Sequence, residues 1–207
     1  MPATTRSDVT IRRYDPSDRD ALYAICLKTG ASGDDATDLY LDPQLLGEVY
    51  VGPYVEYGPE LAFVVEDAEG VAGYVLGALD TRAFEARCEA TWWPPLRARY
   101  PVGHFPPGSA DARLLDVVHR PHAAPDDVVR DYPSHLHVDL LPRTQGQGYG
   151  RALIERLLGA LHEAGSPAVH LGVGEANQRA IGFYERMGFT LLRQSTHGRT
   201  LGRSTVV

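Results

Sequence analysis

The sequence is poor in cysteine and contains no long apolar run. Its two cysteines, Cys26 and Cys88, show neither CxxC nor Cys/His spacing, so we expect buried thiols rather than a disulfide or a metal site. No apolar stretch approaches the roughly 18 residues that span a bilayer. Residues 1–8 also lack the apolar segment of a secretory leader, which predicts a cytoplasmic protein without a membrane partner.

An excess of positive charge is also missing. The formal net charge is −7 at pH 7, and no basic stripe is present that could neutralise the phosphates of a nucleic acid. We therefore expect no nucleic-acid partner. The length of 207 residues suits one sizeable core, and we predict a single domain over residues 1–207.

The stretch from residue 135 to residue 164 has the pattern of a strand, a glycine-rich loop and a helix. Apolar and polar residues alternate in its first part, as in a strand that Pro142 ends: Leu136, Val138 and Leu140 against His135, His137 and Asp139. In its last part, apolar residues recur at helical spacing: Leu153, Ile154, Leu157, Leu158 and Leu161. Gly165 and Pro167 then predict the end of this helix.

The loop between them carries Gly146, Gly148 and Gly150 just where the helix begins. The free N–H groups and the dipole of a helix N-terminus favour an anion, and glycine permits close approach to the backbone. The loop contains no Gly-Lys-Ser/Thr, and neither pair of glycines is followed by the Gly or Ala of a dinucleotide-binding fingerprint. The pattern therefore predicts a phosphate site of another kind, or a turn that uses glycine for its conformation alone.

The Gln-x-x-Gly-x-Gly pattern of Gln145, Gly148 and Gly150 resembles the coenzyme A pyrophosphate loop of the GNAT N-acetyltransferases. The segment from Asn177 to Phe189 resembles the Asn…Ala…Phe-Tyr…Gly-Phe helix of the same superfamily. Over most of residues 9–205, the chain is similar to bacterial acetyltransferases that resemble the acetyltransferase-like C-terminal domain of eukaryotic O-GlcNAc hydrolase. The resemblance implies an α/β GNAT fold, in which helices flank a mixed central sheet.

The same resemblance implies that acetyl-CoA is the co-substrate and that no metal takes part. Val138 and Leu140 would pair with the pantetheine arm, and Asn177 and Phe183 would contact it from the later helix. Asn177 could equally serve only as a helix N-cap. The pyrophosphate would lie on the loop and the start of its helix: Gln145, Gly146, Gln147, Gly148, Tyr149, Gly150 and Arg151.

For catalysis, Tyr184 matches the family's tyrosine that protonates the leaving thiolate. A phenol has a reference pKa of about 10 and stays protonated at neutral pH, although a core tyrosine would look the same in sequence. The Leu140 backbone N–H is the expected hydrogen-bond donor to the acetyl carbonyl. The alternative is that it only pairs with a neighbouring strand of the sheet. Asp139, with His137 or Glu175, is the expected proton acceptor through water. The alternative is a structural Asp–His pair.

We therefore predict an N-acetyltransferase that moves an acetyl group directly to a small-molecule or peptide amine. The competing hypothesis is a regulatory or interaction module that binds acetyl-CoA without turnover. The sequence leaves open whether the chain is a monomer or a homodimer.

Two further segments are assigned to the acceptor side. The first of these is a tyrosine-rich stretch, residues 39–57. Before it, we expect a strand over residues 9–14, a helix that begins near Asp15 and a break at residues 30–36. The resemblance places this stretch in an acceptor-side lid, where its tyrosines either pack or contact the substrate: Tyr40, Tyr50, Tyr54 and Tyr57.

Residues 82–133 form an insertion between a predicted hairpin, residues 61–79, and the cofactor-binding strand. Insertions of this length commonly act as lids or binding walls, and its adjacent Trp92 and Trp93 argue against disorder. These tryptophans either dock the insertion or line the acceptor pocket. We expect a helix over residues 82–90, and a closing hairpin of residues 190–194 and 199–206 about a His197-Gly198 turn.

Overall fold

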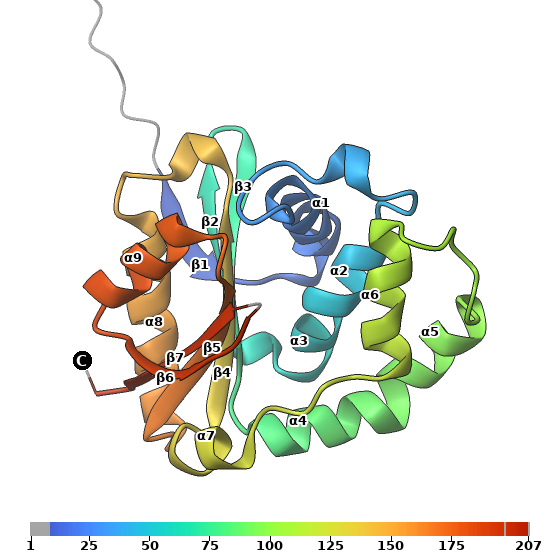
Figure 1. Cartoon of the computed structure of the whole chain (residues 1–207). Coiled ribbons are helices and arrows are strands. Elements are labelled where there is room, and N and C mark those ends of the chain that lie inside the picture. Colours follow the sequence, from blue (N-terminus) through green and yellow to red (C-terminus); the bar gives the residue numbers. More distant parts are fainter. Residues whose placement is uncertain (1–8, 197, 207) are drawn as a thin grey trace, which may run out of the picture.

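A computed structural model of the chain describes residues 9–196 and 198–206. Its centre is a seven-stranded sheet with the strand order β1-β2-β3-β4-β5-β7-β6 (Figure 1). All neighbouring strands are antiparallel except β4 and β5, which are parallel. The strands are β1 Thr10–Arg13, β2 Ala62–Asp67, β3 Gly70–Ala78, β4 Ser134–Leu140, β5 Ala168–Gly174, β6 Thr190–Gln194 and β7 Gly198–Ser204.

Helices cover both faces of the sheet, which Figure 1 shows almost edge-on. The short α7, Asp126–Asp131, lies near β5 at one end of the sheet. One face of the sheet is covered by two helices, α8 Tyr149–Glu163 and α9 Gln178–Arg186. The other face is covered by a larger layer of helices. The larger layer contains α1 Arg19–Thr29, α2 Leu45–Tyr50, α3 Gly52–Tyr57, α4 Thr81–Arg87, α5 Trp93–Arg99 and α6 Ala110–His119.

The predicted mixed α/β sheet with flanking helices is confirmed. The β2–β3 hairpin turns between Asp67 and Gly70, as expected, and β6 pairs with β7. His197, at the predicted turn of this second hairpin, lies outside the described residues. Four short 3-10 segments connect the elements: Pro16–Asp18, Thr37–Leu39, Pro59–Leu61 and Pro142–Thr144.

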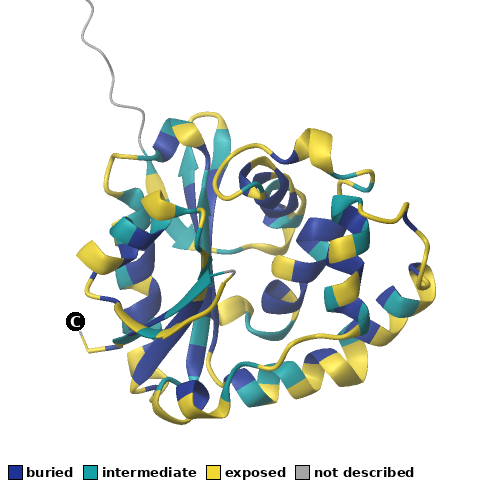
Figure 2. Ribbon diagram, viewed as in Figure 1, coloured by how far each residue is buried: buried dark blue, intermediate teal, exposed yellow. Residues whose placement is uncertain are grey.

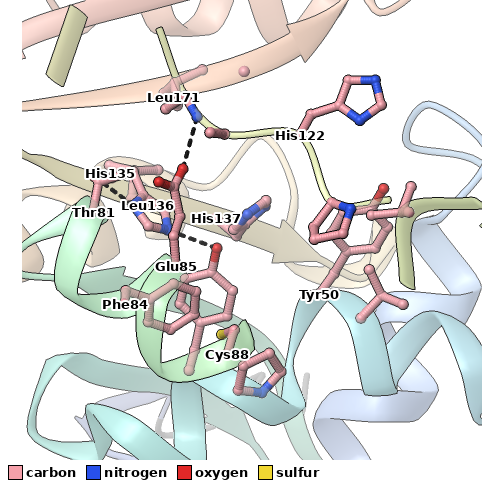
Figure 3. A pocket seen from close by; sticks show the side chains of 18 of the residues that line it. Tyr50, Thr81, Phe84, Glu85, Cys88, His122, His135, Leu136, His137 and Leu171 are labelled. Atoms are coloured by element: carbon pink, nitrogen blue, oxygen red, sulfur yellow. Dashed lines mark hydrogen bonds between the residues drawn. The ribbon is translucent and has the colours of Figure 1, made fainter. Parts of the chain in front are cut away.

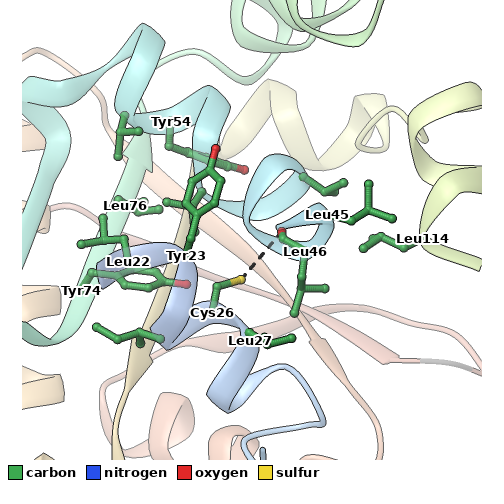
Figure 4. Packing of buried hydrophobic residues seen from close by; sticks show 14 of the residues in the cluster. Leu22, Tyr23, Cys26, Leu27, Leu45, Leu46, Tyr54, Tyr74, Leu76 and Leu114 are labelled. Atoms are coloured by element: carbon green, nitrogen blue, oxygen red, sulfur yellow. Dashed lines mark hydrogen bonds between the residues drawn. The ribbon is translucent and has the colours of Figure 1, made fainter. Parts of the chain in front are cut away.

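Each helical layer buries its apolar side against the sheet, as the dark blue faces in Figure 2 show. On α8, the predicted apolar stripe is completely buried, with Leu153, Leu157 and Leu161 each at 0% exposure. Burying a leucine side chain stabilises a fold by about 1.5–3 kcal/mol, so this stripe anchors the helix whose first turn borders the glycine loop. On the other face, Leu22, Leu45 and Tyr74 pack in a second cluster (Figure 4).

The insertion folds into helices rather than a loop. Asp80 caps α4, because its carboxylate accepts the Ala83 N–H at 2.9 Å. The expected single helix over residues 82–90 is wrong in its length: α4 continues through a π-helical turn, Cys88–Trp92, into α5. Two prolines follow Trp93 at the start of α5, where a missing N–H is tolerated.

Both cysteines are buried free thiols, as the sequence predicts.

Candidate active site

The central strands β4 and β5 separate soon after they meet. In the described chain their parallel ladder consists of Ser134 with Val169 and His135 with His170. On its other side, β4 stays paired with β3, where the Leu141 N–H donates to the Ala72 carbonyl at 2.8 Å. Because backbone groups alternate in direction along a strand, the N–H and C=O of Leu140 point away from β3, into the gap.

Two cavities open along this gap. The first, which we call the glycine-loop cavity, has a volume of about 590 Å³ and is bordered by the end of β4, by loop residues 144–150 and by α9. The second, the histidine cavity, has a volume of about 480 Å³ and lies between β4, β5, α3 and the insertion. It takes its name from His135, His137 and His170, which line it together.

Two of the loop glycines have backbone conformations that side chains rarely adopt. Gly146 has φ +72° and Gly148, the N-cap of α8, has φ +89°, in the left-handed region that glycine enters without cost. Gly150 differs from these two, because it packs closely: a Cβ there would lie 3.3 Å from the Phe183 ring, which would have to shift slightly. The loop therefore exposes the first N–H groups of a long helix, which is an arrangement that binds anions.

Gln145 fixes the backbone beside this loop. Its amide Nε2 donates to the Leu140 carbonyl at 2.7 Å, which satisfies the acceptor that faces the gap. The neighbouring Leu140 N–H is left as a donor toward the glycine-loop cavity.

The structure brings most of the predicted cofactor residues to this one cavity. Gln147 and Tyr149 are exceptions: the Gln147 side chain donates to the Arg143 carbonyl at 2.7 Å, and Tyr149 packs against the core beneath α8. Asn177 caps α9 by accepting the Ala180 N–H at 3.0 Å and also lines the cavity. The predicted residues that line it are Val138, Asp139, Leu140, Gln145, Gly146, Gly148, Gly150, Arg151, Asn177, Phe183 and Tyr184.

Two ionisable groups of the predicted catalytic set meet in the glycine-loop cavity. Burial raises the pKa of Tyr184, and the nearby Asp139 carboxylate raises it further. Burial also raises the pKa of Asp139, which accepts a hydrogen bond from the Tyr74 hydroxyl at 2.6 Å. Tyr184 is therefore protonated at neutral pH, and Asp139 is a stronger base than an exposed carboxylate.

His135 is the centre of a satisfied hydrogen-bond chain (Figure 3). The Thr81 hydroxyl donates to the Pro133 carbonyl at 2.7 Å, so at the 2.8 Å contact between Thr81 Oγ1 and His135 Nδ1 the imidazole must be the donor. His135 Nε2 then accepts from the Tyr54 hydroxyl at 2.9 Å. This chain uses both ring nitrogens of a neutral His135, whose pKa burial lowers well below 6.5.

His137 lies on the same face of β4, one step closer to Asp139. Its ring centroid is 5.1 Å from that of Tyr54 and 5.8 Å from that of Tyr50. Burial lowers the pKa of His137 to about 4, so its imidazole is neutral at physiological pH. His170 likewise has a lowered pKa because it is buried, and its Nδ1 donates to the Tyr132 carbonyl at 2.8 Å.

The lowered pKa of His137 predicts a pH dependence of stability. The unfolded chain takes up a proton near the reference pKa of 6.5, whereas the folded chain does so only near pH 4. Stability is therefore fully present above pH 6.5 and is lost as the pH falls from 6.5 toward 4. His137→Asn should lower the slope of the unfolding free energy against pH in this window by up to about 1.4 kcal/mol per pH unit. Urea unfolding at several pH values measures the slope, and equal slopes for the two proteins would contradict the assignment.

Glu175 lies apart from both cavities. Its carboxylate receives two hydrogen bonds from Arg199, at 2.8 and 3.0 Å, and this pairing lowers the pKa of Glu175. A carboxylate held in this way is a weaker base than a free one.

The structure adds residues that we did not predict from the sequence. The segment that follows α1 borders the glycine-loop cavity with Thr29, Ser32, Gly33 and Asp34. Two arginines of α9, Arg179 and Arg186, line the same cavity and form no ion pair with other described residues. They share one helix face with Phe183, at spacings of four and seven residues, and this periodicity in the sequence could have revealed them.

The two segments assigned to the acceptor side border the histidine cavity in part. Tyr50, Tyr54 and Trp93 line it, whereas Trp92 docks the insertion by donating its indole N–H to the Glu48 carbonyl at 2.8 Å. Tyr40 and Tyr57 pack at the edge of the core.

Within residues 9–196 and 198–206, no group of three or more His, Cys, Asp or Glu side chains could hold a metal ion. The same part of the chain has no helix with the length and apolar character needed to cross a bilayer.

Comparisons with known proteins agree with this geometry. Residues 127–189 match the family model of the acetyltransferase (GNAT) family. The crystal structure of SsHAT superimposes with a TM-score of 0.90 and 44% sequence identity, and the match covers 96% of this chain and 99% of that chain. The chain therefore belongs to the GNAT acetyltransferase family.

More distant relatives share parts of this similarity. Protein O-GlcNAcase from Rattus norvegicus is 28% identical over 192 residues, which make up 90% of this chain. The chain spans only 21% of the length of that relative. The structure of yncA, a putative acetyltransferase from Salmonella typhimurium with its cofactor acetyl-CoA, has the same fold, with a TM-score of 0.56 and 19% identity over 95% or more of both chains.

Proposed function

We propose that this chain transfers the acetyl group of acetyl-CoA, bound in the glycine-loop cavity, directly to an amine that enters through the histidine cavity. The observation that carries the proposal is that one strand lines both cavities. On β4, His135 and His137 face the histidine cavity, and the residues from Val138 to Leu140 face the other. An amine beside His137 would therefore lie next to a thioester held along the end of β4.

The residues of the glycine-loop cavity suit coenzyme A. The amides of the loop and of the first turn of α8 would hold the pyrophosphate, and Arg179 and Arg186 add positive charge for the remaining phosphate. The free edge of β4 at Val138 and Leu140 offers backbone groups to the pantetheine amides. Acetyl-CoA in this position supplies an acetyl group activated as a thioester, and the Leu140 N–H points to where its carbonyl oxygen would lie.

Proton movement follows from the pair formed by Asp139 and Tyr184. As the amine nitrogen bonds to the acetyl carbon and the carbon–sulfur bond breaks, Asp139 accepts the amine proton, directly or through water beside His137. Tyr184 gives its proton to the departing thiolate. The Asp139 charge raises the pKa of Tyr184, so protonation of Asp139 removes that effect and makes Tyr184 a stronger acid when the thiolate needs a proton.

A two-part measurement tests the proposal. Acetyl-CoA is titrated into the purified protein by calorimetry, and free thiol is then followed over a panel of amines and peptides. We expect binding, together with thiol release that depends on the acceptor. Tight binding without release on any acceptor would favour the regulatory hypothesis, and the absence of binding would overturn the site assignment.

Asp139→Asn separates catalysis from binding in the same assay. Asparagine keeps the size of the side chain and can still accept the Tyr74 hydrogen bond, but it cannot accept a proton. We expect unchanged affinity for acetyl-CoA and a rate lowered by about 100-fold, within the usual range for general-base catalysis. An unchanged rate and pH profile would make Asp139 a structural residue.

A further inference from the structure

The walls of the histidine cavity are mostly aromatic and aliphatic. Its volume of about 480 Å³ lies within the range of sites that bind small molecules. Aromatic rings come from α3, from the end of α2 and from the insertion, and aliphatic side chains fill the spaces between them. The apolar residues that define it are Val49, Tyr50, Pro53, Tyr54, Phe84, Trp93, Val117 and Pro121.

Apart from the histidines, each charged side chain that lines this cavity among the described residues is already paired. Neither lysine nor arginine borders it, and its carboxylates, Glu85 and Glu89, are already paired. Glu85 accepts hydrogen bonds from Arg82 at 2.6 Å and from the Ala124 N–H at 2.7 Å. Both oxygens of Glu89 are held by Arg97, at 2.7 and 2.8 Å. A charged group on a ligand would therefore find no lysine or arginine beside it and no carboxylate that is not already engaged.

His137 is a polar group that remains available deep in the cavity, whereas His122 lines it from an exposed position in the insertion. The nitrogens of His135 and the Nδ1 of His170 are engaged as described above, whereas His137 forms no hydrogen bond with other described residues. A neutral imidazole has one donor and one acceptor nitrogen. Because His137 is neutral and lies next to Asp139 on β4, it offers a position for the amino group of an acceptor, at the end of the cavity nearest the proposed cofactor site.

On the basis of the proposed function, we infer that the acceptor is a small aliphatic amine that carries an aromatic ring and no second charged group. Its ring lies among Tyr50, Tyr54 and Phe84, where aromatic contacts and burial of apolar area favour it. Its amino group lies at His137. A carboxylate, a phosphate or a second ammonium elsewhere on the molecule would be buried without a partner, which is costly in an apolar site.

Matched acceptors test the substrate class. With saturating acetyl-CoA, kcat/KM is measured for 2-phenylethylamine, for phenylalanine, which adds a carboxylate to the same skeleton, and for 4-(aminomethyl)phenethylamine, which adds a second ammonium. We expect the added charge to lower kcat/KM by about 100-fold or more in each case. Equal or better rates with either charged compound would overturn the inference.

A pair of glycine variants locates the acceptor. Gly172 of β5 lines the histidine cavity, and a Cβ there would meet no atom within 4 Å, so we use Gly172→Leu to add bulk to this cavity. Gly159 of α8 also has open space around its Cβ but lies across the sheet, and Gly159→Leu is the matched control. We expect Gly172→Leu to lower kcat/KM for 2-phenylethylamine by about 10-fold or more, while both variants keep the affinity of the wild type for acetyl-CoA.

The outcomes separate the two proposals. Thiol release with a lysine peptide or an aminoglycoside but not with 2-phenylethylamine would overturn the substrate class and leave the transferase proposal standing. If Gly172→Leu acetylates 2-phenylethylamine as fast as Gly159→Leu does, the histidine cavity is not where this acceptor binds. No thiol release with any acceptor would overturn both proposals.

Discussion

Replacing Gly148 by valine is expected to weaken acetyl-CoA binding by at least about 100-fold, which corresponds to about 3 kcal/mol. Gly148 has φ +89° at the N-cap of α8, a conformation that a β-branched residue rarely adopts. Valine would force the loop to rearrange, and the amides that face the pyrophosphate would move. Each hydrogen bond to a charged group contributes about 1.5–3 kcal/mol, so losing one or two accounts for the effect. Isothermal titration calorimetry measures it.

Two controls separate the loop conformation from general damage. Asparagine enters the left-handed region more readily than valine, so Gly148→Asn should bind acetyl-CoA with an affinity between those of Gly148→Val and the wild type. Gly159→Ala, eleven residues further along the same helix, should leave binding unchanged. Undiminished binding by Gly148→Val would remove the assignment of this loop to the cofactor.

Tyr184→Phe is expected to lower kcat by about 100-fold to 1,000-fold while leaving the affinity for acetyl-CoA within about twofold of the wild type. Phenylalanine retains the ring and its packing against Phe183 and Phe189, whose centroids lie 5.4 and 5.6 Å away. Only the hydroxyl, and with it the proton for the thiolate, is lost. Single-turnover kinetics with a good acceptor, followed by thiol release, measures the chemical step directly.

Tyr14→Phe is the matched control for this substitution. Tyr14 packs against the core on the far side of the sheet from α9 and borders neither cavity. The Tyr14→Phe variant should therefore have the same kcat as the wild type. An unchanged rate for Tyr184→Phe would mean that the thiolate obtains its proton from another group.

The alternation along β4 and the stripe on α8 could be predicted from the sequence because each depends on local periodicity. His135, His137 and Asp139 share one face, and the five apolar residues of the α8 stripe are buried. The glycine loop could be recognised for the same reason, since positive φ angles require glycine within a short stretch of chain.

Other features depend on contacts between distant parts of the chain. From the sequence, the segment with Ser32 and Gly33 could be predicted only as a break between helices. In the structure it lies beside Asn177, since a Cβ built on Gly33 would be 3.8 Å from the Asn177 side-chain nitrogen. No local pattern predicts a contact between such distant parts of the chain. The different roles of Trp92 and Trp93 depend on which side of a π-helical turn faces α2. The ion pair between Glu175 and Arg199 joins the turn after β5 to the strand β7, so the sequence could not show that this candidate base is already paired.

The short ladder between β4 and β5 leaves the sheet joined by few backbone bonds at its centre. The strands from β1 to β4 form one antiparallel unit, and β5, β7 and β6 form another. A molecule lying along the free edge of β4 would complete the missing pairing and hold the two units in register. If acetyl-CoA binds there as proposed, it would stabilise the fold by an amount that rises with the logarithm of its concentration above the dissociation constant, so the supply of this metabolite would affect how readily the protein unfolds as well as how fast it works.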